Sequence, residues 1–334
     1  MQILRKLLFP FSILYGIIVW FRNKFFDWGI LTSASYDFPV ITVGNLSMGG
    51  TGKSPMIEYL IGLLHHNYPI ATLSRGYKRK TKGFLLLNVA SDAKDVGDEP
   101  LQFKNKFPEV LVAVDENRQN GIKNLRSLEQ PPQIILLDDA YQHRKVKAGF
   151  SILLTAYGDL YSKDMILPAG NLRETTSGAH RADVIIVTKC DLDISKEEKR
   201  KIKTSLAIKS HQKLFFTGIH YENYFTNGVQ QIPLQLMENF SLVTGIAKPQ
   251  PLVNHLKENG LDFEHFAYPD HHLFTEKELQ ELRSLSLIVT TEKDFMRLKE
   301  HLPHEKLFYL PIKTVFLEDQ EVFDKEVMSF VAQA

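Results

Sequence analysis

Short apolar runs alternate with helix-like segments from Pro39 onward, and this alternation is the dominant pattern of the chain. In the first half the apolar, β-rich runs occupy residues 39–44, 70–74, 111–115 and 133–139, and helical patterns cover residues 55–66 and 117–128. Strands that alternate with helices are typical of βαβ units on a parallel sheet. The pattern therefore predicts an α/β protein with a Rossmann-like core and a mainly parallel sheet.

The second half of the chain repeats the pattern. Its apolar runs lie at residues 150–156, 182–189, 214–220, 240–247, 263–269, 286–294 and 307–312, and its helical patterns at 196–210, 251–259 and 276–285. The polar stretch 221–231 is the best candidate for a lobe junction or a hairpin. We therefore divide the chain into residues 1–28, a core of residues 29–222, and a second, smaller α/β lobe of residues 223–334.

The N-terminal segment departs from this pattern. Residues 7–21 carry no charge and lie between Arg5 and Lys6 on one side and Arg22 and Lys24 on the other. A bilayer crossing needs about 20 apolar residues, so a spanning helix here would be strained. A cleaved secretory signal would end in small residues, which do not follow this run.

Aromatic residues alternate with cations where the apolar run ends. They are Trp20, Phe21, Phe25, Phe26 and Trp28. Rings and cations both find partners among lipid headgroups, so we predict that residues 1–28 form a helix that lies in, or dips into, one membrane leaflet. A buried core helix is the alternative interpretation.

Composition and charge exclude several classes of function. The 334 residues are enough for a large core in two lobes. The 40 basic and 39 acidic side chains nearly cancel, so there is no overall field to hold a nucleic acid. The single cysteine, Cys190, excludes an intrachain disulfide and a cysteine-rich zinc site, which fits a reducing compartment such as the cytoplasm.

The strongest chemical signal is the segment 43–55, VGNLSMGGTGKSP, which follows a predicted strand and precedes a predicted helix. This is the context that a P-loop requires. Its glycines let the backbone approach phosphate oxygens while N–H groups at the helix start point at them. The predicted nucleotide contacts are Gly49, Gly50, Thr51, Gly52, Lys53 and Ser54.

Lys53 and Ser54 supply the chemistry expected of such a loop. Lys53 would neutralise the β- and γ-phosphates of a nucleotide, and the Ser54 hydroxyl would bind Mg²⁺. The usual spacing, G-x-x-x-x-G-K-[ST], has a glycine where this chain has Ser47. A chance glycine-rich turn is the alternative, and the coincidence of strand, glycines, lysine, serine and helix argues against it.

Two pairs of adjacent carboxylates are further candidates. Asp138 and Asp139 end an apolar strand, where an aspartate beside a P-loop can hold Mg²⁺ directly or through water. Asp98 and Glu99 stand between a glycine and a proline; one could accept the proton of an alcohol during phosphorylation while the other helps to hold metal. A solvated strand end and an exposed turn are the alternative interpretations.

Two histidines follow an aspartate in the segment 268–274, YPDHHLF. A histidine close to a catalytic aspartate can orient it or shift its pKa. The alternative is a hydrogen-bonded loop histidine. A zinc site would need more ligands within reach than the scattered ones that the sequence offers.

Eight motifs, spread from residue 43 to 294, carry a resemblance to one family of enzymes. They are GNLSMGGTGKSP, SRGYKRK, VGDEP, LLDDAYQHR, LPAGNLRE, VTKCD, YPDHHLF and TTEKD. In this order the series resembles the tetraacyldisaccharide 4′-kinases of lipid A biosynthesis. Ala140 and Tyr141 stand where that family usually has Gly and Phe, Asn171 where it has Pro, and Ser54 where Thr is common. None of these departures removes a charged or nucleophilic group.

The resemblance implies a P-loop NTPase-like kinase that uses ATP and Mg²⁺. The implied reaction is phosphorylation of the 4′-hydroxyl of a tetraacyl glucosamine disaccharide 1-phosphate, which gives lipid IVA. The implied location is the cytoplasmic face of the bacterial inner membrane, with the N-terminal helix peripheral or monotopic. The implied partners are the lipid A disaccharide precursor and the membrane surface, with no nucleic acid and no obligate protein partner.

Carried over residue by residue, the resemblance gives roles to the candidates. The implied catalytic residues are Asp98, paired with His271, and Lys53. The implied metal site comprises Ser54, Glu99, Asp138 and Asp139. The implied contacts to the lipid sugar or its phosphate are Arg75, Arg118, Gln142, His143, Arg173 and Glu174.

Three other functions remain as alternatives. TKCD at residues 188–191 has the form of a guanine-specificity motif after a strand, which suggests a membrane-associated GTP-binding switch protein. A partition-type ATPase would have a lysine in its P-loop where this chain has Met48. A membrane-tethered binding module would keep its function in a Lys53→Ala variant.

Overall fold

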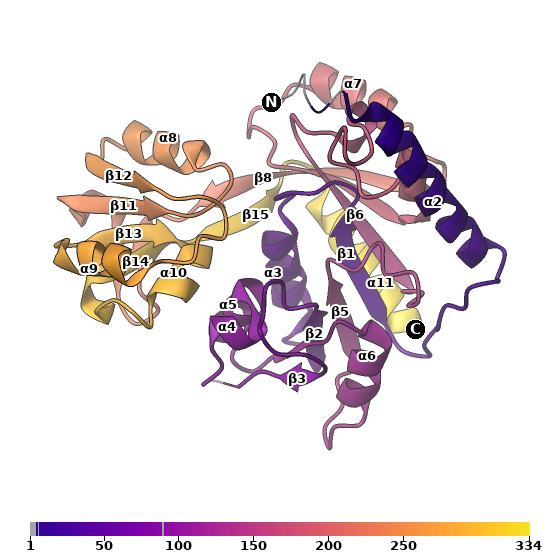
Figure 1. The fold of residues 1–334 in the computed structure, drawn as a ribbon, viewed down its shortest axis with the longest axis horizontal. Helices are drawn as coiled ribbons and strands as arrows, with labels where there is room; N and C mark the ends of the chain where they lie inside the picture. Colours follow the sequence, from indigo (N-terminus) through magenta and orange to yellow (C-terminus); the bar gives the residue numbers. More distant parts are fainter. Residues whose placement is uncertain (1–4, 6, 89) are drawn as a thin grey trace.

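Two β-sheets organise residues 5, 7–88 and 90–334, which are the residues that the computed structural model describes (Figure 1). The nine-stranded sheet has the order β15-β8-β7-β6-β1-β5-β2-β4-β3, and the six-stranded sheet has the order β10-β9-β14-β13-β11-β12. We call each sheet with its helices the first and the second lobe. The predicted α/β class, with a mainly parallel sheet and a smaller second unit, is confirmed.

The first lobe has a parallel sheet with antiparallel edges. Its strands are β1 (Val40–Asn45), β2 (Ile70–Ser74), β3 (Leu85–Leu86), β4 (Leu111–Val114), β5 (Ile134–Asp138), β6 (Phe150–Ala156), β7 (Val184–Thr188), β8 (Lys213–Tyr221) and β15 (Ile312–Phe316). Only β3 and β15, at the two edges, pair antiparallel with their neighbours in the described chain. The strands β1, β2, β5 and β7 are buried at every position, as expected for parallel strands covered on both faces.

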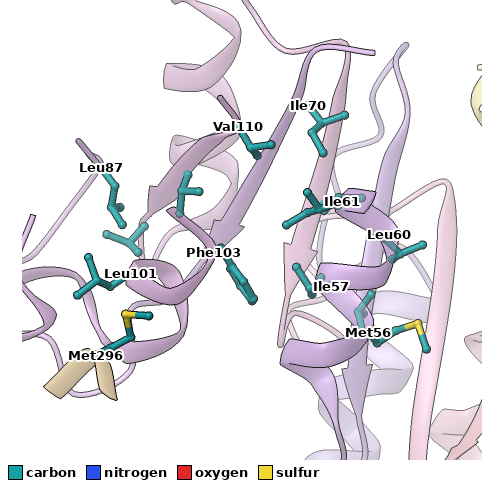
Figure 2. Close-up of a cluster of buried hydrophobic side chains, with 14 of the residues drawn as sticks. Met56, Ile57, Leu60, Ile61, Ile70, Leu87, Leu101, Phe103, Val110 and Met296 are labelled. Atoms are coloured by element: carbon teal, nitrogen blue, oxygen red, sulfur yellow. The ribbon is translucent and has the colours of Figure 1, made fainter. Parts of the chain in front are cut away.

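The helices of the first lobe supply much of its apolar core. They are α3 (Lys53–Leu64), α4 (Ala93–Val96), α5 (Asp98–Lys106), α6 (Arg118–Arg126), α7 (Lys196–Leu206) and α11 (Gln320–Gln333), with 3₁₀ turns at Tyr161–Lys163 and Thr176–Arg181. Figure 2 shows Ile57 and Ile61 of α3 beside Ile70 and Phe103 in this core. The helix predicted from residue 55 begins earlier, at Lys53, because Gly52 takes the left-handed conformation that starts it.

The second lobe has its own parallel sheet and a terminal hairpin. Its strands are β9 (Tyr224–Thr226), β10 (Gln231–Pro233), β11 (Phe240–Thr244), β12 (Phe263–Ala267), β13 (Ile288–Thr291) and β14 (Leu307–Leu310). Its helices are α8 (Gln250–Glu258), α9 (Glu276–Ser284) and α10 (Glu292–Leu298), with 3₁₀ turns at Leu234–Leu236 and His304–Lys306. The polar stretch 221–231 contains the lobe change after β8, strand β9 and the turn that leads into β10.

The C-terminal end of the chain returns to the first lobe, which differs from the predicted second lobe of residues 223–334. Strand β15 pairs antiparallel with β8, and α11 buries Phe323, Val327 and Val331 in the core that includes β1 and α3. Figure 1 shows β8 and β15 running side by side between the lobes. The difference arises because β8 has an open edge that β15 fills, and chain order alone does not reveal this pairing.

Helix α2 (Phe9–Asp27) lies along the outside of the first lobe, away from the second (Figure 1). Within it only Ser12 and Val19 are buried, whereas the large apolar side chains around it are exposed, among them Phe11 at 62% and Ile18 at 59%. The alternative of a buried core helix is therefore wrong. In the part of the chain that the structure describes, no helix is both long enough and apolar enough for a membrane crossing.

Candidate active site

The P-loop joins β1 to α3 at the carboxyl edge of the first sheet. Gly49 and Gly52 have φ of 119° and 79°, which side chains with a Cβ rarely adopt, so the loop needs glycine at both positions. The first N–H groups of α3 have no partners within the helix and face the loop. A helix start of this kind attracts anions, and it provides the phosphate cradle that the sequence predicts.

Two residues at the carboxyl end of β7 hold the P-loop in place. The Thr188 hydroxyl donates to the carbonyl oxygen of Thr51 at 2.8 Å, and Lys189 Nζ donates to the carbonyl oxygen of Gly50 at 2.6 Å. Sequence reasoning missed this role, because it considered residues 188–191 only as a guanine-specificity motif. The available signal was their position at the carboxyl end of a strand near the P-loop strand.

Asp139 contacts two cationic side chains of the site, Lys53 and Arg173. Lys53 Nζ lies 3.7 Å from Asp139 Oδ1, and Arg173 binds both oxygens of this carboxylate, at 2.8 and 3.1 Å. Burial acts to raise the pKa of Asp139, but the charge of Lys53 and the Arg173 contact outweigh it and lower the pKa to about 2. Asp139 is therefore ionised at neutral pH and orients both cations.

Asp138 differs from its neighbour in having a carboxylate oxygen without a partner. It ends β5 opposite Val43 of β1, so it lies beside the start of the P-loop. Its Oδ1 is buried and makes no hydrogen bond to any described residue. Burial raises the pKa of Asp138 to about 7, and the negative charges of Asp139 and Glu99 act in the same direction. Such an oxygen is suited to a cation that the protein itself does not supply.

Asp98 and His271, which the family resemblance pairs, meet at the boundary between the lobes. Asp98 is the first residue of α5, and its Oδ2 lies 3.4 Å from His271 Nδ1 and 2.8 Å from Arg297 Nε. Burial acts to raise the pKa of Asp98, but the His271 hydrogen bond and the charge of Arg297 lower it overall. Asp98 is thus kept ionised, and its Oδ2 is held in place by His271 and Arg297.

Helix α10 contributes two functional residues that sequence reasoning did not single out. Lys293 Nζ lies 3.0 Å from His271 Nε2 and 2.8 Å from Glu99 Oε1. Arg297, one turn further along, contacts Asp98 and also lies 3.1 Å from Asp294. The motif TTEKD precedes or includes these residues, but a seven-residue helix gives too little periodicity to predict which faces the site.

Gln142 and Glu174 join the P-loop region as a hydrogen-bonded pair. Gln142 Nε2 donates to the carbonyl oxygen of Asn45 at 2.7 Å and to Glu174 Oε1 at 3.1 Å. Glu174 is buried and also accepts from Arg181 Nη2 at 2.8 Å. With Arg173, which also donates to the carbonyl oxygen of Asn45, three of the six predicted substrate residues are brought together at the end of β1.

The other three predicted substrate residues occupy different environments. Arg118 is buried and donates to the carbonyl oxygens of Asp115 and Asp138 at 2.7 and 3.3 Å, so it ties the ends of two strands together. Arg75 is exposed after β2. His143 is half-buried, and burial with the charge of Arg118 lowers its pKa to about 4, which keeps the ring neutral.

Helix α2 is hydrogen-bonded to the same segment. Asn23 Nδ2 donates to Glu174 Oε2 at 2.9 Å, and the Tyr15 hydroxyl donates to the carbonyl oxygen of Arg173 at 3.0 Å. An open apolar groove of about 610 Å³ runs along the helix, lined by Phe9, Ser12, Ile13, Gly16, Ile17, Trp20, Phe21, Met165, Ile166 and Thr175. The apolar helix therefore connects directly to the polar residues beside the P-loop.

Comparison with known proteins gives concordant matches over the whole chain. The family model described as tetraacyldisaccharide-1-P 4′-kinase matches residues 4–332. A tetraacyldisaccharide 4′-kinase of Flavobacterium psychrophilum is 53% identical, with 99% of this chain and 98% of that protein covered. One of Bacteroides thetaiotaomicron is 43% identical, with 99% and 94% covered.

A solved structure is also similar. It is the "apo" form of LpxK from Aquifex aeolicus in complex with ATP, which is 30% identical with a TM-score of 0.78 and covers 98% of this chain and 99% of its own. The similarity extends over both lobes, because nearly all of each chain is aligned.

Proposed function

Because the chain belongs to the tetraacyldisaccharide-1-P 4′-kinase family, we propose that it transfers the γ-phosphate of ATP to the 4′-hydroxyl of a tetraacyl glucosamine disaccharide 1-phosphate. The product is lipid IVA, and the reaction belongs to lipid A biosynthesis. The observation that supports this best is the convergence of a P-loop with an ionised, histidine-paired carboxylate at the lobe boundary. This combination supplies a phosphate donor site and a base for an alcohol acceptor.

The donor side rests on the residues of the P-loop. Lys53 and the N–H groups at the start of α3 neutralise the phosphates of ATP. Within the described residues no group of three or more His, Cys, Asp or Glu side chains is placed to hold a metal. This fits Mg²⁺, which is usually bound by one or two carboxylates with nucleotide phosphates and waters.

The residues that would hold Mg²⁺ are Ser54 and Asp138, and the charges of Asp139 and Glu99 act on Asp138. The buried, unpartnered Oδ1 of Asp138 fits a cation ligand, whereas Asp139 is already engaged by Lys53 and Arg173. When bound, Mg²⁺ would neutralise the charge that develops on the phosphate oxygens. Arg173 and Lys53 contribute positive charge to the same place.

The acceptor side rests on Asp98 as the group that accepts the proton of the 4′-hydroxyl. Among the described residues, His271 and Arg297 both contact Oδ2, which leaves Oδ1 for the substrate. His271 and Lys293 orient the carboxylate from the second lobe. We therefore assign donor binding to residues 29–222 and the orientation of the base to the lobe that follows.

The lipid side rests on α2. Its exposed apolar side chains and adjoining groove would remain among acyl chains, while Tyr15 and Asn23 connect the helix to Arg173 and Glu174. This supports a peripheral or monotopic location at a membrane surface. We propose that this surface is the cytoplasmic face of the inner membrane. The sugar headgroup would then enter between α2 and the P-loop, with Gln142, Arg173 and Glu174 as contacts.

One experiment tests the proposal directly. The purified protein is incubated with [γ-³²P]ATP, Mg²⁺ and the disaccharide 1-phosphate lipid in mixed micelles, and the label is located in the product. Label at the 4′ position is expected from the wild type and from Lys325→Met, an exposed control on α11, but not from Lys53→Met. Transfer to another position, or equal label with Lys53→Met, contradicts the proposal.

The same assay separates the kinase from a GTP-binding switch. Lys189, the lysine of the guanine-like motif, is bonded to the Gly50 carbonyl, and a switch needs neither the Asp98–His271 pair nor an apolar helix. We expect ATP to support turnover far better than GTP. A strong preference for GTP would favour the switch.

A further inference from the structure

Three charged side chains form a cluster where the two lobes meet, with two buried carboxylates and a lysine that is 27% exposed. Lys106 Nζ of α5 lies 2.7 Å from Glu58 Oε2 of α3 and 3.4 Å from Glu292 Oε1 of α10. The carboxylate side chains are only 7% and 5% exposed. Gln102 Nε2 adds a hydrogen bond to Glu58 Oε1 at 2.7 Å. One ammonium thus bridges two carboxylates that come from different lobes.

Such a cluster contributes little to the free energy of unfolding. Removing charges from water costs as much as their attraction returns, so apolar side chains of similar volume would stabilise the fold equally well or better. The bonds of an ion cluster, however, have fixed directions and lengths, whereas apolar contact is non-directional. The cluster is therefore better suited to fixing relative position than to adding stability.

The apolar packing around the cluster does not by itself fix the relative position of the helices. Around the cluster, the contact between α5 and α10 is apolar and adaptable, with Met296 close to Leu101 (Figure 2). At the other end of α5, ion pairs of Asp98 with Arg297 and of Glu99 with Lys293 also join the two helices. Lys106 differs from these pairs because it bonds α10 and α3 at the same time. Methionine is unbranched and fills irregular gaps, so it specifies alignment poorly. Alignment of the helices must come from the polar contacts.

All three helices carry residues of the proposed active site. Helix α3 begins at Lys53, α5 begins at Asp98, and α10 carries Lys293 next to Glu292. Lys106 lies two turns from Asp98 on the same helix, about 12 Å along its axis. A helix transmits displacement over this length with little loss, so a shift at the cluster moves the base relative to the P-loop.

We propose that Lys106 is a positioning residue, which with Glu58 and Glu292 fixes α10 against α3 and α5 and thereby places the Asp98–His271 pair opposite Lys53. The inference rests on the proposed function, because phosphoryl transfer is one of its readouts. It predicts that the cluster affects kcat rather than the binding of ATP.

The first test compares two lysines of the same helix. Lys106→Met keeps most of the unbranched side chain and removes the ammonium group. Lys104 is the matched control, because its Nζ donates to the carbonyl oxygens of Pro108 and Val110 within the first lobe. A misplacement of about 1 Å lowers turnover by on the order of 10²-fold. We expect a loss approaching this size in kcat for Lys106→Met, an unchanged KM for ATP, and wild-type kinetics for Lys104→Met.

A second variant separates position from stability. Lys106→Met leaves two buried carboxylates facing each other, which lowers the thermal midpoint. In Glu58→Gln/Lys106→Met/Glu292→Gln no charge remains, so the midpoint should recover while kcat stays low. Glu292→Gln alone keeps an oxygen that accepts from Lys106, so its kcat should remain at the wild-type level.

The position itself can be measured without activity. Nitroxides on Glu129→Cys in the first lobe and Lys257→Cys in the second are both at exposed sites, and the native Cys190 is buried. Double electron–electron resonance should give a broader distance distribution in Lys106→Met and in the triple variant than in wild type or Lys104→Met. Wild-type kcat in Lys106→Met, or an unchanged distribution, overturns the inference. If the wild type phosphorylates no lipid, the proposed function fails, and the distance distributions still decide the inference.

Discussion

Replacing Asp98 by asparagine isolates the charge of the proposed base. Asparagine has the same shape, so its oxygen can still accept from Arg297 Nε, which now lies 2.8 Å from Asp98 Oδ2. Arg297 also keeps Asp294, at 3.1 Å, as a partner. The variant should therefore fold, with a loss of stability of about 1.5–3 kcal/mol at most for one charged hydrogen bond.

The expected kinetic effect follows from the basicity of Asp98. General base catalysis contributes about 10²–10⁴-fold and is most effective when the pKa lies near the working pH. The pKa of Asp98 is below its usual value, because the His271 hydrogen bond and the charge of Arg297 outweigh the effect of burial. Phosphoryl transfer also passes through a loose transition state that demands little proton removal. We therefore expect the lower end of the range, about 10²-fold in kcat or roughly 2.7 kcal/mol.

Single-turnover transfer from [γ-³²P]ATP, with enzyme in excess over lipid, measures this step. The rate constant should fall while the affinity for ATP, measured by equilibrium titration, stays unchanged. Because the pKa of Asp98 is lowered, the wild type should show no loss of rate from Asp98 protonation between about pH 5 and 8. Near-wild-type transfer by a folded Asp98→Asn protein refutes the assignment.

Three further predictions follow from the packing and charge of the site. Deletion of residues 1–28 should weaken flotation with vesicles and lipid turnover more than ATP binding, since the apolar α2 is removed, and unchanged flotation would contradict this. Gly44→Ala would place a Cβ 2.6 Å from Tyr141 Cβ, so calorimetry should show a loss of about 1–3 kcal/mol; an unchanged midpoint would mean that Tyr141 moves freely. Asp138→Asn should raise the thermal midpoint of the nucleotide-free protein at pH 8 but not at pH 4, while kinase activity is lost. The pKa of Asp138 rises from 3.8 to about 7 on folding, so the folded state holds the extra proton and the wild type loses stability over that interval. Equal midpoints of the two proteins at pH 8 would refute this.

Local chemistry could be predicted from the sequence because its parts are contiguous. Strand, glycines, Lys53 and helix start follow one another in the P-loop, so covalent geometry alone brings them together. Asp98 and His271 are far apart in the chain, and only the resemblance to a family paired them. The structure places them 3.4 Å apart.

Contacts between charged residues of different elements could not be predicted in the same way. Lys189 resembled part of a nucleotide-specificity motif, yet its ammonium group is bonded to the P-loop backbone. Arg297 and Lys293 lie on a short helix whose pattern does not indicate which face is turned to the site. A sequence does not reveal which of its 79 Lys, Arg, Asp and Glu side chains, the sum of 40 and 39, lose water on folding.

The sequence by itself determined the α/β class, the P-loop and the unusual apolar N-terminus, because period, spacing and composition act over a few residues. Tertiary structure alone decided that β15 and α11 return to the first lobe, that α2 leaves its apolar side chains exposed, and that Glu58, Lys106 and Glu292 meet. These features depend on which edges and faces are still uncovered once the sheets have formed. That information lies in the packing of distant segments, and no local pattern contains it.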